Sequence, residues 1–450
     1  MQRLVILGAG ESGLGAAMLA KREGYVVFVS DAGKISEARK AEMQRLEIPF
    51  EEGMHTEEEI LSADLIIKSP GIPTKVAIVQ NALKAKIQVI DELEFASRYS
   101  KGKVIAITGT NGKTTTTLLT YHLMKEAGLD VGLAGNVGRS WASQLLEGDR
   151  EWWVIECSSF QIDGFVDFKP SVAILTNITP DHLDRYEYQI DKYIDSKFGI
   201  FKNMSANDQA ILFAEDILTM EGLRNNPIQP IQNWISLESA QSSGGYFNGS
   251  SLEINVVGHS ATIPLNVLPI QGKHNMLNAL CAGSAALIAG LDEQAIIAGI
   301  QTFKNAPHRM EQIREIDGVK FINDSKGTNV EATAYALASY DNPLIWIAGG
   351  VDKGNNYAVI SPVVAEKVKS LICLGKDNEK LKTAFGSTVP DVRETQDISE
   401  AVKWGQVLGE PGDIVLLSPA CASFDLFKNY EDRGNQFRAA VENLKPKAIA

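Results

Sequence analysis

Residues 107–117 read ITGTNGKTTTT. The stretch begins at the end of an apolar run, KVIAIT, and ends in the first residues of a helix-like run, TTTTLLTYHLMKEAG. An ordinary phosphate loop has the spacing G-x-x-x-x-G-K-S/T. Its first glycine position is Ile107 here, and the nearer Gly109 gives a shorter G-x-x-G-K-T. Backbone N–H groups at the start of a helix bind phosphate whatever the glycine count. We therefore predict a nucleotide-binding loop, with Lys113 as its cation and the Thr114 hydroxyl as a Mg²⁺ ligand.

Two apolar segments after this helix end in residues that suit a metal ion. WWVIEC ends near Glu156, and VAILTNI ends just before TPDHLD, which contains His182. Ligands of an open α/β sheet bind beyond the carboxyl ends of its strands, so the loop, Glu156 and His182 are expected at one edge. A carboxylate and an imidazole beside phosphates suit a divalent metal. Two ordinary explanations stay open: Glu156 could pair with a neighbouring cation, and His182 could cap a turn.

Lys197 lies on the apolar face of a predicted helix. In QIDKYIDSKFGIF the apolar residues fall at 190, 193, 194, 198 and 201, which is the spacing of one helical face, and Lys197 lies on that face. A lysine there can extend along the apolar stripe to reach water. The alternative is a modified or strongly paired lysine near the active site.

The N-terminus carries a second glycine pattern. Gly8, Gly10 and Gly13 give G-x-G-x-x-G after an apolar run, and Asp31 ends the next run. This pattern predicts a dinucleotide site, although a helix N-terminus accepts any diphosphate. A nicotinamide-dependent oxidoreductase would explain the pattern but not the central loop, Glu156 or His182. A noncatalytic nucleotide-binding regulator is the other class considered, and the full set of charged site residues argues against it.

Strand-like and helix-like segments alternate along the chain, which predicts an α/β protein of three domains. We expect a Rossmann-like domain over residues 1–98, and a central P-loop-type ATPase-like α/β domain with a small antiparallel part over 99–305. A C-terminal Rossmann-like α/β domain is expected over 306–450. The polar stretch SRYSKGK marks the first boundary and NAPHRM the second, and the antiparallel part is expected between about 205 and 265.

Composition excludes several classes of function. The net charge of −13 disfavours a nucleic-acid partner. No apolar run approaches the roughly 20 residues of a membrane span, and the N-terminus lacks the pattern of a signal peptide. The four cysteines are far apart, which argues against a zinc site or a disulfide framework. We expect a cytoplasmic protein with no membrane partner.

Several strings occur in the order seen in one known family: TGTNGKTTT, the strand ending at Glu156, TNITPDHLDRY, the Lys197 helix, GKHNMLNAL, APHRME and NDSKGTN. The chain resembles the Mur ligases over nearly its whole length. Within that family, NDSKGTN and SPACASFDLFKNYEDRG resemble the members that add D-glutamate. Two positions depart from the family pattern: Gly327 stands where alanine is usual, and Tyr430 where phenylalanine is frequent. Neither change removes a charged contact.

The resemblance implies an ATP-dependent ligase that joins D-glutamate to UDP-N-acetylmuramoyl-L-alanine through an acyl phosphate, during synthesis of peptidoglycan precursors. A sibling ligase that adds another amino acid is the alternative within the family. ATP, two Mg²⁺ ions and a carbamylated Lys197 are the implied cofactors, and a monomer is expected. Carbamate formation needs a neutral amine, so burial must lower the pKa of Lys197 below its usual value of roughly 10.4.

The resemblance also implies a role for each matching residue. The implied catalytic residues are Lys113, His182, Lys197 and Arg309, and the implied metal ligands are Thr114, Glu156, His182 and the carbamate of Lys197. Those implied for ATP are Gly109, Thr110, Asn111, Gly112, Lys113, Thr114, Thr115, Asn275, Arg309, Asp324 and Lys326. Those implied for the UDP-muramoyl substrate are Gly10, Glu11, Ser12, Asp31, Ser69, Gly71, Asn136, Ser158 and His182. Those implied for D-glutamate are Thr328, Lys353, Ser423, Phe424 and Tyr430.

Overall fold

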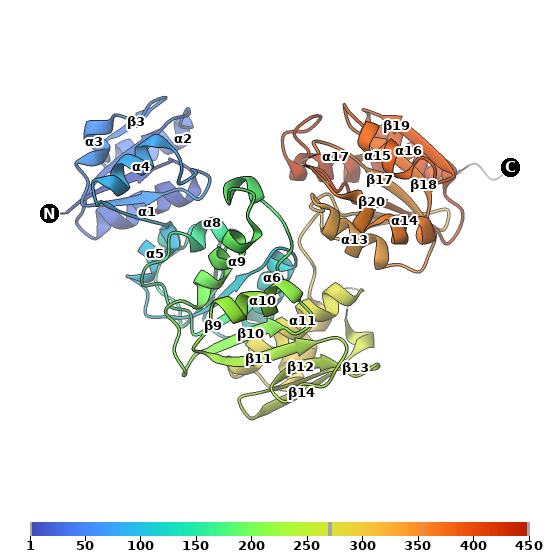
Figure 1. Ribbon diagram of the computed structural model, residues 1–450, viewed down its shortest axis with the longest axis horizontal. Helices are drawn as coiled ribbons and strands as arrows, with labels where there is room; N and C mark the ends of the chain where they lie inside the picture. The colour runs from blue at the N-terminus through green and yellow to red at the C-terminus, as the bar shows by residue number, and fades with distance from the viewer. Residues whose placement is uncertain (1, 269–271, 353, 448–450) are drawn as a thin grey trace. The chain divides into compact units, whose positions relative to one another are not determined.

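The computed structural model describes residues 2–268, 272–352 and 354–447, which form two compact units (Figure 1). The first unit comprises Met1–Pro269 and Leu277–Phe303, and the second comprises Ile270–Met276 and Lys304–Ala450. The first unit contains two sheets and the second contains one. The expected α/β class with three mostly parallel-sheet domains is confirmed, whereas the exact limits at 98/99 and 305/306 stay predictions.

The N-terminal sheet is parallel throughout, with the strand order β3-β2-β1-β4-β5. Its strands are β1 (Arg3–Leu7), β2 (Val26–Asp31), β3 (Phe50–Glu52), β4 (Leu65–Lys68) and β5 (Gln88–Ile90). The helices between them are α1 (Glu11–Arg22), α2 (Glu37–Arg45), α3 (Glu57–Leu61) and α4 (Ala77–Lys84), and α5 (Glu92–Ser97) follows β5. The strand order reverses between β1 and β4, and ligands of such sheets bind at that point.

The turn from β1 into α1 and the first turn of α1 each require a glycine. Gly8 has a φ of +96°, a conformation that L side chains rarely adopt. A Cβ on Gly13 would lie 1.8 Å from the carbonyl oxygen of Gly8, so α1 packs directly on the turn. The first and third glycines of the sequence pattern are therefore required by close backbone packing.

The central sheet has nine strands in the order β14-β13-β12-β11-β10-β9-β6-β8-β7. Its strands are β6 (Lys103–Thr108), β7 (Val131–Gly135), β8 (Trp152–Glu156), β9 (Val172–Leu175), β10 (Gln209–Phe213), β11 (Ile231–Ser236), β12 (Gly244–Phe247), β13 (Ser251–Val256) and β14 (His259–Pro264). Its helices are α6 (Lys113–Glu126), α7 (Trp141–Leu145), α8 (Ser159–Ile162), α9 (Ile190–Phe198), α10 (Ile217–Asn225), α11 (Lys273–Ile288) and α12 (Glu293–Thr302). Short 3₁₀ turns are η1 (Leu183–Arg185), η2 (Gly199–Phe201) and η3 (Leu265–Val267).

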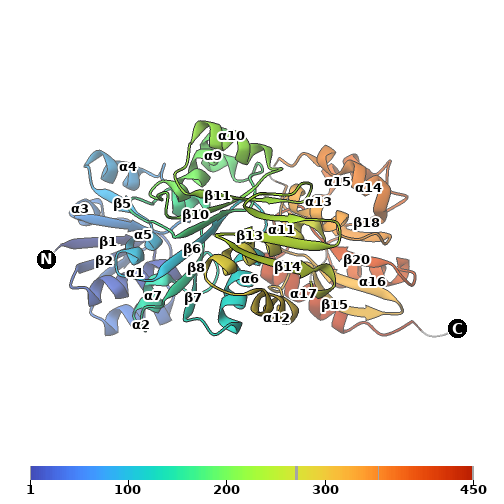
Figure 2. The same cartoon turned by 90° about the horizontal axis from the view of Figure 1, so that it is seen from below.

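The antiparallel part of this sheet is smaller than the sequence suggested. Among the described strands of this sheet, the antiparallel pairs are β12–β13 and β13–β14, while β10 and β11 extend the parallel sheet. The strand QAILF of β10 is almost wholly buried, as parallel strands are, and the Gly/Ser turn signals begin only after Ser236. Figure 2 shows α11 and α12 beside the antiparallel strands, where Gly283 of α11 packs against Ile254 and Ile263.

The sheet of the second unit has the order β15-β16-β20-β17-β18-β19; among its described strands, β15 and β16 pair antiparallel and the other pairs are parallel. Its strands are β15 (Glu311–Ile316), β16 (Val319–Asn323), β17 (Leu344–Ala348), β18 (Val368–Leu374), β19 (Asp391–Thr395) and β20 (Ile414–Leu417). Its helices are α13 (Val330–Ala338), α14 (Ser361–Lys367), α15 (Glu379–Phe385), α16 (Ile398–Leu408) and α17 (Tyr430–Glu442), with a 3₁₀ turn η4 (Tyr357–Val359). Strands β17 and β20 are buried along their whole length, so the core lies on both faces of the sheet.

Two further features concern the chain as a whole. The four cysteines, Cys157, Cys281, Cys373 and Cys421, are all buried and all free. Within the described ranges, no helix combines the length and the apolar content that a membrane crossing requires.

Candidate active site

The loop between β6 and α6 depends on its two glycines. Gly109 and Gly112 have φ angles of +143° and +83°. A Cβ on Gly109 would lie 1.9 Å from Thr176 Oγ1, and one on Gly112 would lie 2.5 Å from Asn278 Oδ1. The shorter glycine spacing therefore still gives a tight strand-to-helix turn, with α6 beginning at Lys113. The turn leads directly into the N-terminal end of α6, and a helix end of this kind binds anions.

The segment after β9 holds this loop in shape. Asn177 accepts hydrogen bonds from the N–H of Thr110 at its carbonyl oxygen (2.8 Å) and from the N–H of Asn111 at Oδ1 (2.9 Å). The Thr110 hydroxyl donates to the Thr179 carbonyl (3.1 Å). Our sequence reasoning missed Asn177 and Thr179 as bracing residues. Their position directly after the strand that pairs with β6 is the signal that could have revealed them.

Lys113 lies at the start of α6 with its head group over the loop. Its Nζ donates to the carbonyl oxygens of Gly109 (2.9 Å) and Thr110 (2.8 Å). Thr114 and Thr115 follow it in the first turn of α6, and both are buried. Lys113, Thr114 and Thr115 thus lie together at the N-terminal end of α6, the kind of helix end that binds phosphate.

Glu156 ends β8 beside the loop and is almost fully buried, at 1% exposure. Its Oε1 accepts a hydrogen bond from Asn136 Nδ2 (2.7 Å). Among the described residues, its Oε2 is buried with no hydrogen-bond partner. A buried carboxylate oxygen of this kind costs free energy unless a cation meets it, so the site fits a Mg²⁺ ion.

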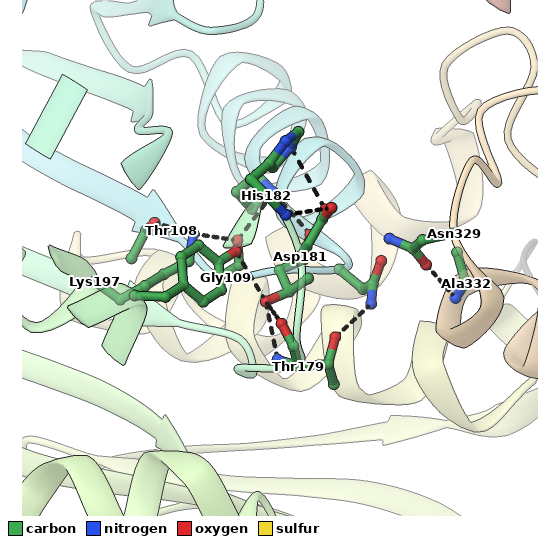
Figure 3. Close-up of polar contacts among 12 residues, drawn as sticks. Thr108, Gly109, Thr179, Asp181, His182, Lys197, Asn329 and Ala332 are labelled. Carbon is green, nitrogen blue, oxygen red and sulfur yellow. Dashed lines mark hydrogen bonds and ion pairs between the residues drawn. The ribbon is translucent and has the colours of Figure 1, made fainter. Parts of the chain in front are cut away.

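Lys197, on α9, is 1% exposed, so it does not extend to water. Its Nζ donates to the Gly109 carbonyl (2.7 Å) and lies 3.4 Å from Thr108 Oγ1 (Figure 3). Burial holds its pKa well below the usual value, and the positive charge of Lys113 acts in the same direction. The structure therefore brings a lysine that favours the neutral amine to the back of the phosphate loop.

His182 lies in a left-handed conformation, with φ of +52°, at the start of η1. Its Nε2 is 3.5 Å from Asp181 Oδ2 (Figure 3). Its ring packs edge-on against the Phe160 ring, with the ring centres 5.2 Å apart. Asp181 was not singled out from the sequence, although it stands beside His182 in TPDHLD. No group of three or more His, Cys, Asp or Glu side chains is arranged as a metal site in the described part of the chain. A metal here would need ligands of other kinds, such as the Thr114 hydroxyl and phosphate oxygens.

The N-terminal glycine turn has its own bracing carboxylate. Asp31 accepts a hydrogen bond from Ala9 N at Oδ2 and from Gly33 N at Oδ1, both at 2.7 Å. Gly10 precedes α1 and has open space beside it, while Glu11 and Ser12 form the first turn of α1. A Cβ on Gly8 would lie 2.5 Å from Ser69 Oγ, so the loop after β4 lies against the turn.

Ser158 and Gly71 occupy different local settings. The Ser158 side chain caps α8 in a reciprocal arrangement with Gln161. Gly71 lies in the loop after β4, where its carbonyl accepts a hydrogen bond from Arg185.

The remaining predicted residues lie in the second unit. Asp324 is buried: its Oδ2 accepts from Ser418 Oγ (2.8 Å), and burial raises its pKa to about 7. The Nζ of Lys326 lies 3.8 Å from the centre of the Tyr430 ring, and the Tyr430 carbonyl accepts from Ser325 Oγ (2.8 Å). These contacts bring the NDSKGTN segment and the start of α17 together.

Other predicted residues of this unit have simpler settings. Ser423 is buried and Phe424 is 71% exposed. Thr328 donates its N–H to the Lys326 carbonyl, and Arg309 contributes a positive charge near Asp324. Asn275 is buried near the start of α11, and Lys353 lies outside the described residues.

Arg433 is a buried residue of this region that the sequence did not single out, although it stands in the quoted string SPACASFDLFKNYEDRG. At 1% exposure its guanidinium donates to the carbonyls of Ser325 (2.9 Å), Gly349 (3.3 Å) and Cys421 (3.2 Å). It therefore ties together the segments that follow β16, β17 and β20.

A phosphate loop on a parallel sheet, accompanied by two further mostly parallel sheets, defines a multidomain α/β nucleotide-binding protein. Three family descriptions match the chain in succession: "Mur ligase MurD-like, N-terminal domain" over residues 2–91, "Mur ligase middle domain" over 107–286, and "Mur ligase, glutamate ligase domain" over 308–421. The chain belongs to the Mur ligase family.

Individual relatives agree with this assignment. A protein of Christiangramia forsetii named UDP-N-acetylmuramoylalanine--D-glutamate ligase is 48% identical, over 98% of this chain and 100% of its own. A protein of Cytophaga hutchinsonii with the same name is 49% identical, over 98% of this chain and 99% of its own. The solved structure of a pseudomurein peptide ligase type C from Methanothermus fervidus matches 99% of this chain and 100% of its own, with a TM-score of 0.64 and 19% identity. At that identity the likeness shows the fold alone.

Proposed function

We propose that this protein joins D-glutamate to UDP-N-acetylmuramoyl-L-alanine at the expense of ATP, in the cytoplasmic synthesis of peptidoglycan precursors. The observation that carries the proposal is the identity of 48% and 49%, over nearly the whole chain, to relatives that bear the name of this ligase. The phosphate loop with Lys113 and the orphaned oxygen of Glu156 supply a place for ATP and Mg²⁺.

The first chemical step activates the substrate. A carboxylate is a poor electrophile for an amine, because its leaving group would be oxide. The bond between the γ-phosphorus and ADP breaks, and a new bond forms to the carboxylate oxygen of the muramoyl substrate, which gives an acyl phosphate. The loop N–H groups and Lys113 hold the ATP phosphates, while Asn275, Arg309, Asp324 and Lys326 complete the ATP site.

The second step forms the amide. The amine of D-glutamate attacks the acyl carbon, a tetrahedral intermediate forms, and phosphate leaves as the nitrogen loses a proton. Holding the reactants in line can supply about 7–11 kcal/mol of barrier reduction. Thr328, Lys353 and Ser423, with backbone at Phe424 and Tyr430, hold D-glutamate.

The chain's own residues also account for the metal and the UDP substrate. Thr114, Glu156, His182 and a carbamylated Lys197 would hold two Mg²⁺ ions, which when bound offset the charge of the phosphate oxygens. Gly10, Glu11 and Ser12 face the diphosphate of UDP, and Asp31 faces the uridine. The muramoyl part lies near Ser69, Gly71, Asn136, Ser158 and His182, and the enzyme acts as a monomer.

The setting of Lys197 supports the proposal that this lysine is carbamylated. An ammonium group there would face Mg²⁺ across a partly dry site, and like charges at such distances repel strongly. The lowered pKa favours the neutral amine, which is the form that reacts with CO₂. The carbamate replaces a buried cation by a carboxylate-like ligand.

The test is a ligation assay with ATP, UDP-N-acetylmuramoyl-L-alanine and a panel of amino acids. We expect ADP, phosphate and product with D-glutamate alone. Product with another amino acid would instead identify a sibling ligase. A parallel titration with NAD checks the N-terminal turn, since tight NAD binding that competes with the UDP compound would contradict the assignment.

A further inference from the structure

The loop after β4 reads SPGI over residues 69–72. Two basic side chains, Lys68 and Arg185, donate hydrogen bonds to all four of its carbonyls. Lys68 Nζ donates to the carbonyls of Ile72 (2.8 Å) and Ser69 (3.4 Å). From the central domain, Arg185 donates to the carbonyls of Pro70 (Nη2, 3.3 Å) and Gly71 (Nη1, 3.4 Å). The loop is therefore held from its own domain and from the neighbouring one.

Arg185 is itself fixed in place. It ends η1, three residues after His182, and its guanidinium carbon lies 4.2 Å from the centre of the Phe160 ring. The same ring packs against His182 at 5.2 Å. A planar guanidinium on an aromatic face keeps its fork of donors in one orientation, which suits contact with two adjacent carbonyls.

Hydrogen bonds also link the residue after Arg185 to the helix that carries Lys197. Tyr186, the next residue, donates its hydroxyl to Asp163 Oδ2 (3.1 Å) and lies 3.1 Å from Ser196 Oγ. The Ser196 hydroxyl bonds the Ser159 carbonyl (3.1 Å). Burial raises the pKa of Asp163, and the charges of Lys68 and Arg185 act in the opposite direction, so both cations lie near this carboxylate.

Carbonyl contacts decide which way the peptide N–H groups point. In a planar trans peptide the C=O of one residue and the N–H of the next point in opposite directions. By holding the Pro70 carbonyl, Arg185 turns the Gly71 N–H to the other side of the loop. A Cβ built on Gly71 would meet nothing within 4 Å, so there is open space beside this residue.

We propose that Arg185 is a positioning residue for the UDP-muramoyl substrate. It presents the Gly71 N–H to the substrate, and it joins the 69–72 loop to the segment that carries His182 at the start of η1. This inference rests on the proposed function for the identity of the substrate bound at residues 69–72.

The test compares Arg185→Ala, Arg185→Lys and the control Arg150→Ala, which removes an exposed ion pair with Asp130 elsewhere in the central domain. Calorimetry with UDP-N-acetylmuramoyl-L-alanine, in the absence of ATP, gives the Kd. Arg185→Ala should raise this Kd about tenfold, the scale on which one charge-assisted hydrogen bond acts. Lysine keeps the charge but not the two-carbonyl fork, so Arg185→Lys should fall between Arg185→Ala and the wild type. Arg150→Ala should match the wild type.

Steady-state kinetics provide the second readout. The KM for the UDP substrate should rise by the same factor in Arg185→Ala, with the KM for ATP unchanged. An unchanged Kd with a lower Tm would show a merely structural role and overturn the proposal, as would equal rises in both KM values. If the wild type binds the UDP compound but forms no product with D-glutamate, the proposed reaction fails. Weaker binding by Arg185→Ala would in that case still support the positioning role.

Discussion

Lys113 is the proposed cation of the phosphate-binding loop, and its Nζ contacts two loop carbonyls. We expect Lys113→Ala to keep the fold, because the side chain contributes charge and not core. Phosphate release should fall about 10²–10³-fold, the typical cost of removing one preorganised group that stabilises a transition state. Phosphate release and circular dichroism measure the two effects. Lys169→Ala, which removes a half-exposed ion pair with Asp208, is the matched control, and near-normal turnover of Lys113→Ala would contradict a nucleotide loop.

The second prediction at the scale of a residue concerns carbamylation of Lys197. Lys197→Ala should be nearly inactive, and a short-chain carboxylic acid should restore part of its activity by occupying the space of the carbamate. Bicarbonate should stimulate the wild type and not the variant. Electron density beyond Nζ in a crystal with metal and nucleotide is the direct observation. A clear, unmodified Lys197 in an active, metal-loaded crystal would refute the proposal.

The thermal stability of the protein gives an independent test of the lowered pKa of Lys197. The folded-state pKa of Lys197 is lowered, so the folded state disfavours its protonated form, and unmodified Lys197 costs stability at neutral pH. Lys197→Met should therefore raise Tm at pH 7 in CO₂-free buffer. In a domain of about 200 residues, each 1 kcal/mol added to the free energy of unfolding raises Tm by roughly 2–4 °C. The gain should fade as the pH rises towards 10.5, where the unfolded lysine loses its proton as well. A lower Tm at pH 7 would show that the ammonium is well accommodated.

At the scale of elements, α5 and α7 meet through a buried carboxylate. Glu92 Oε1 accepts hydrogen bonds from Ser140 Oγ (2.8 Å) and Ala142 N (2.7 Å), and burial raises its pKa to about 7. Since the unfolded pKa is near 4.5, the contribution of Glu92 to stability is present below pH 4.5 and is lost as the pH rises through 7.

Glu92→Gln keeps the accepting oxygen without the charge. At pH 8 we expect the variant to be more stable than the wild type by roughly 1–3 kcal/mol, and at pH 5 we expect a small difference. Urea unfolding at the two pH values measures both numbers. A difference that does not change with pH would show that Glu92 keeps an ordinary pKa.

Sequence reasoning succeeded where elements are marked by local patterns. The strands beside the phosphate loop are continuous apolar runs, and the stripe around Lys197 predicted its inward position correctly. It failed for β10 and β11, because short apolar strands look alike whether their partners are parallel or antiparallel. It also missed the support of Thr110 by Asn177 and of Pro70 by Arg185. Those contacts join residues 67 and 115 positions apart, and only the strand order brings them together.

At the scale of the whole molecule, the proposed function assigns D-glutamate to the third domain. Lys353→Ala should raise the KM for D-glutamate far more than the KM for ATP, because a single ammonium pairs with a carboxylate of the amino acid. The effect on D-glutamate should be about tenfold or more. Initial rates at varied D-glutamate and varied ATP separate the two constants, and equal rises would mean that Lys353 serves another ligand.

The four buried cysteines make the protein suited to experiments with thiol reagents. Burial raises the pKa of Cys281 and Cys373 to about 12, and it raises the pKa of Cys157 and Cys421 as well, so very little thiolate forms near neutral pH. The thiolate is the nucleophile that attacks oxidants and alkylating agents, so each cysteine should react only when the structure around it opens. Cys157 and Cys281 belong to the first unit, and Cys373 and Cys421 to the second. Labelling rates followed by mass spectrometry thus report the opening of each unit separately, without any engineered cysteine.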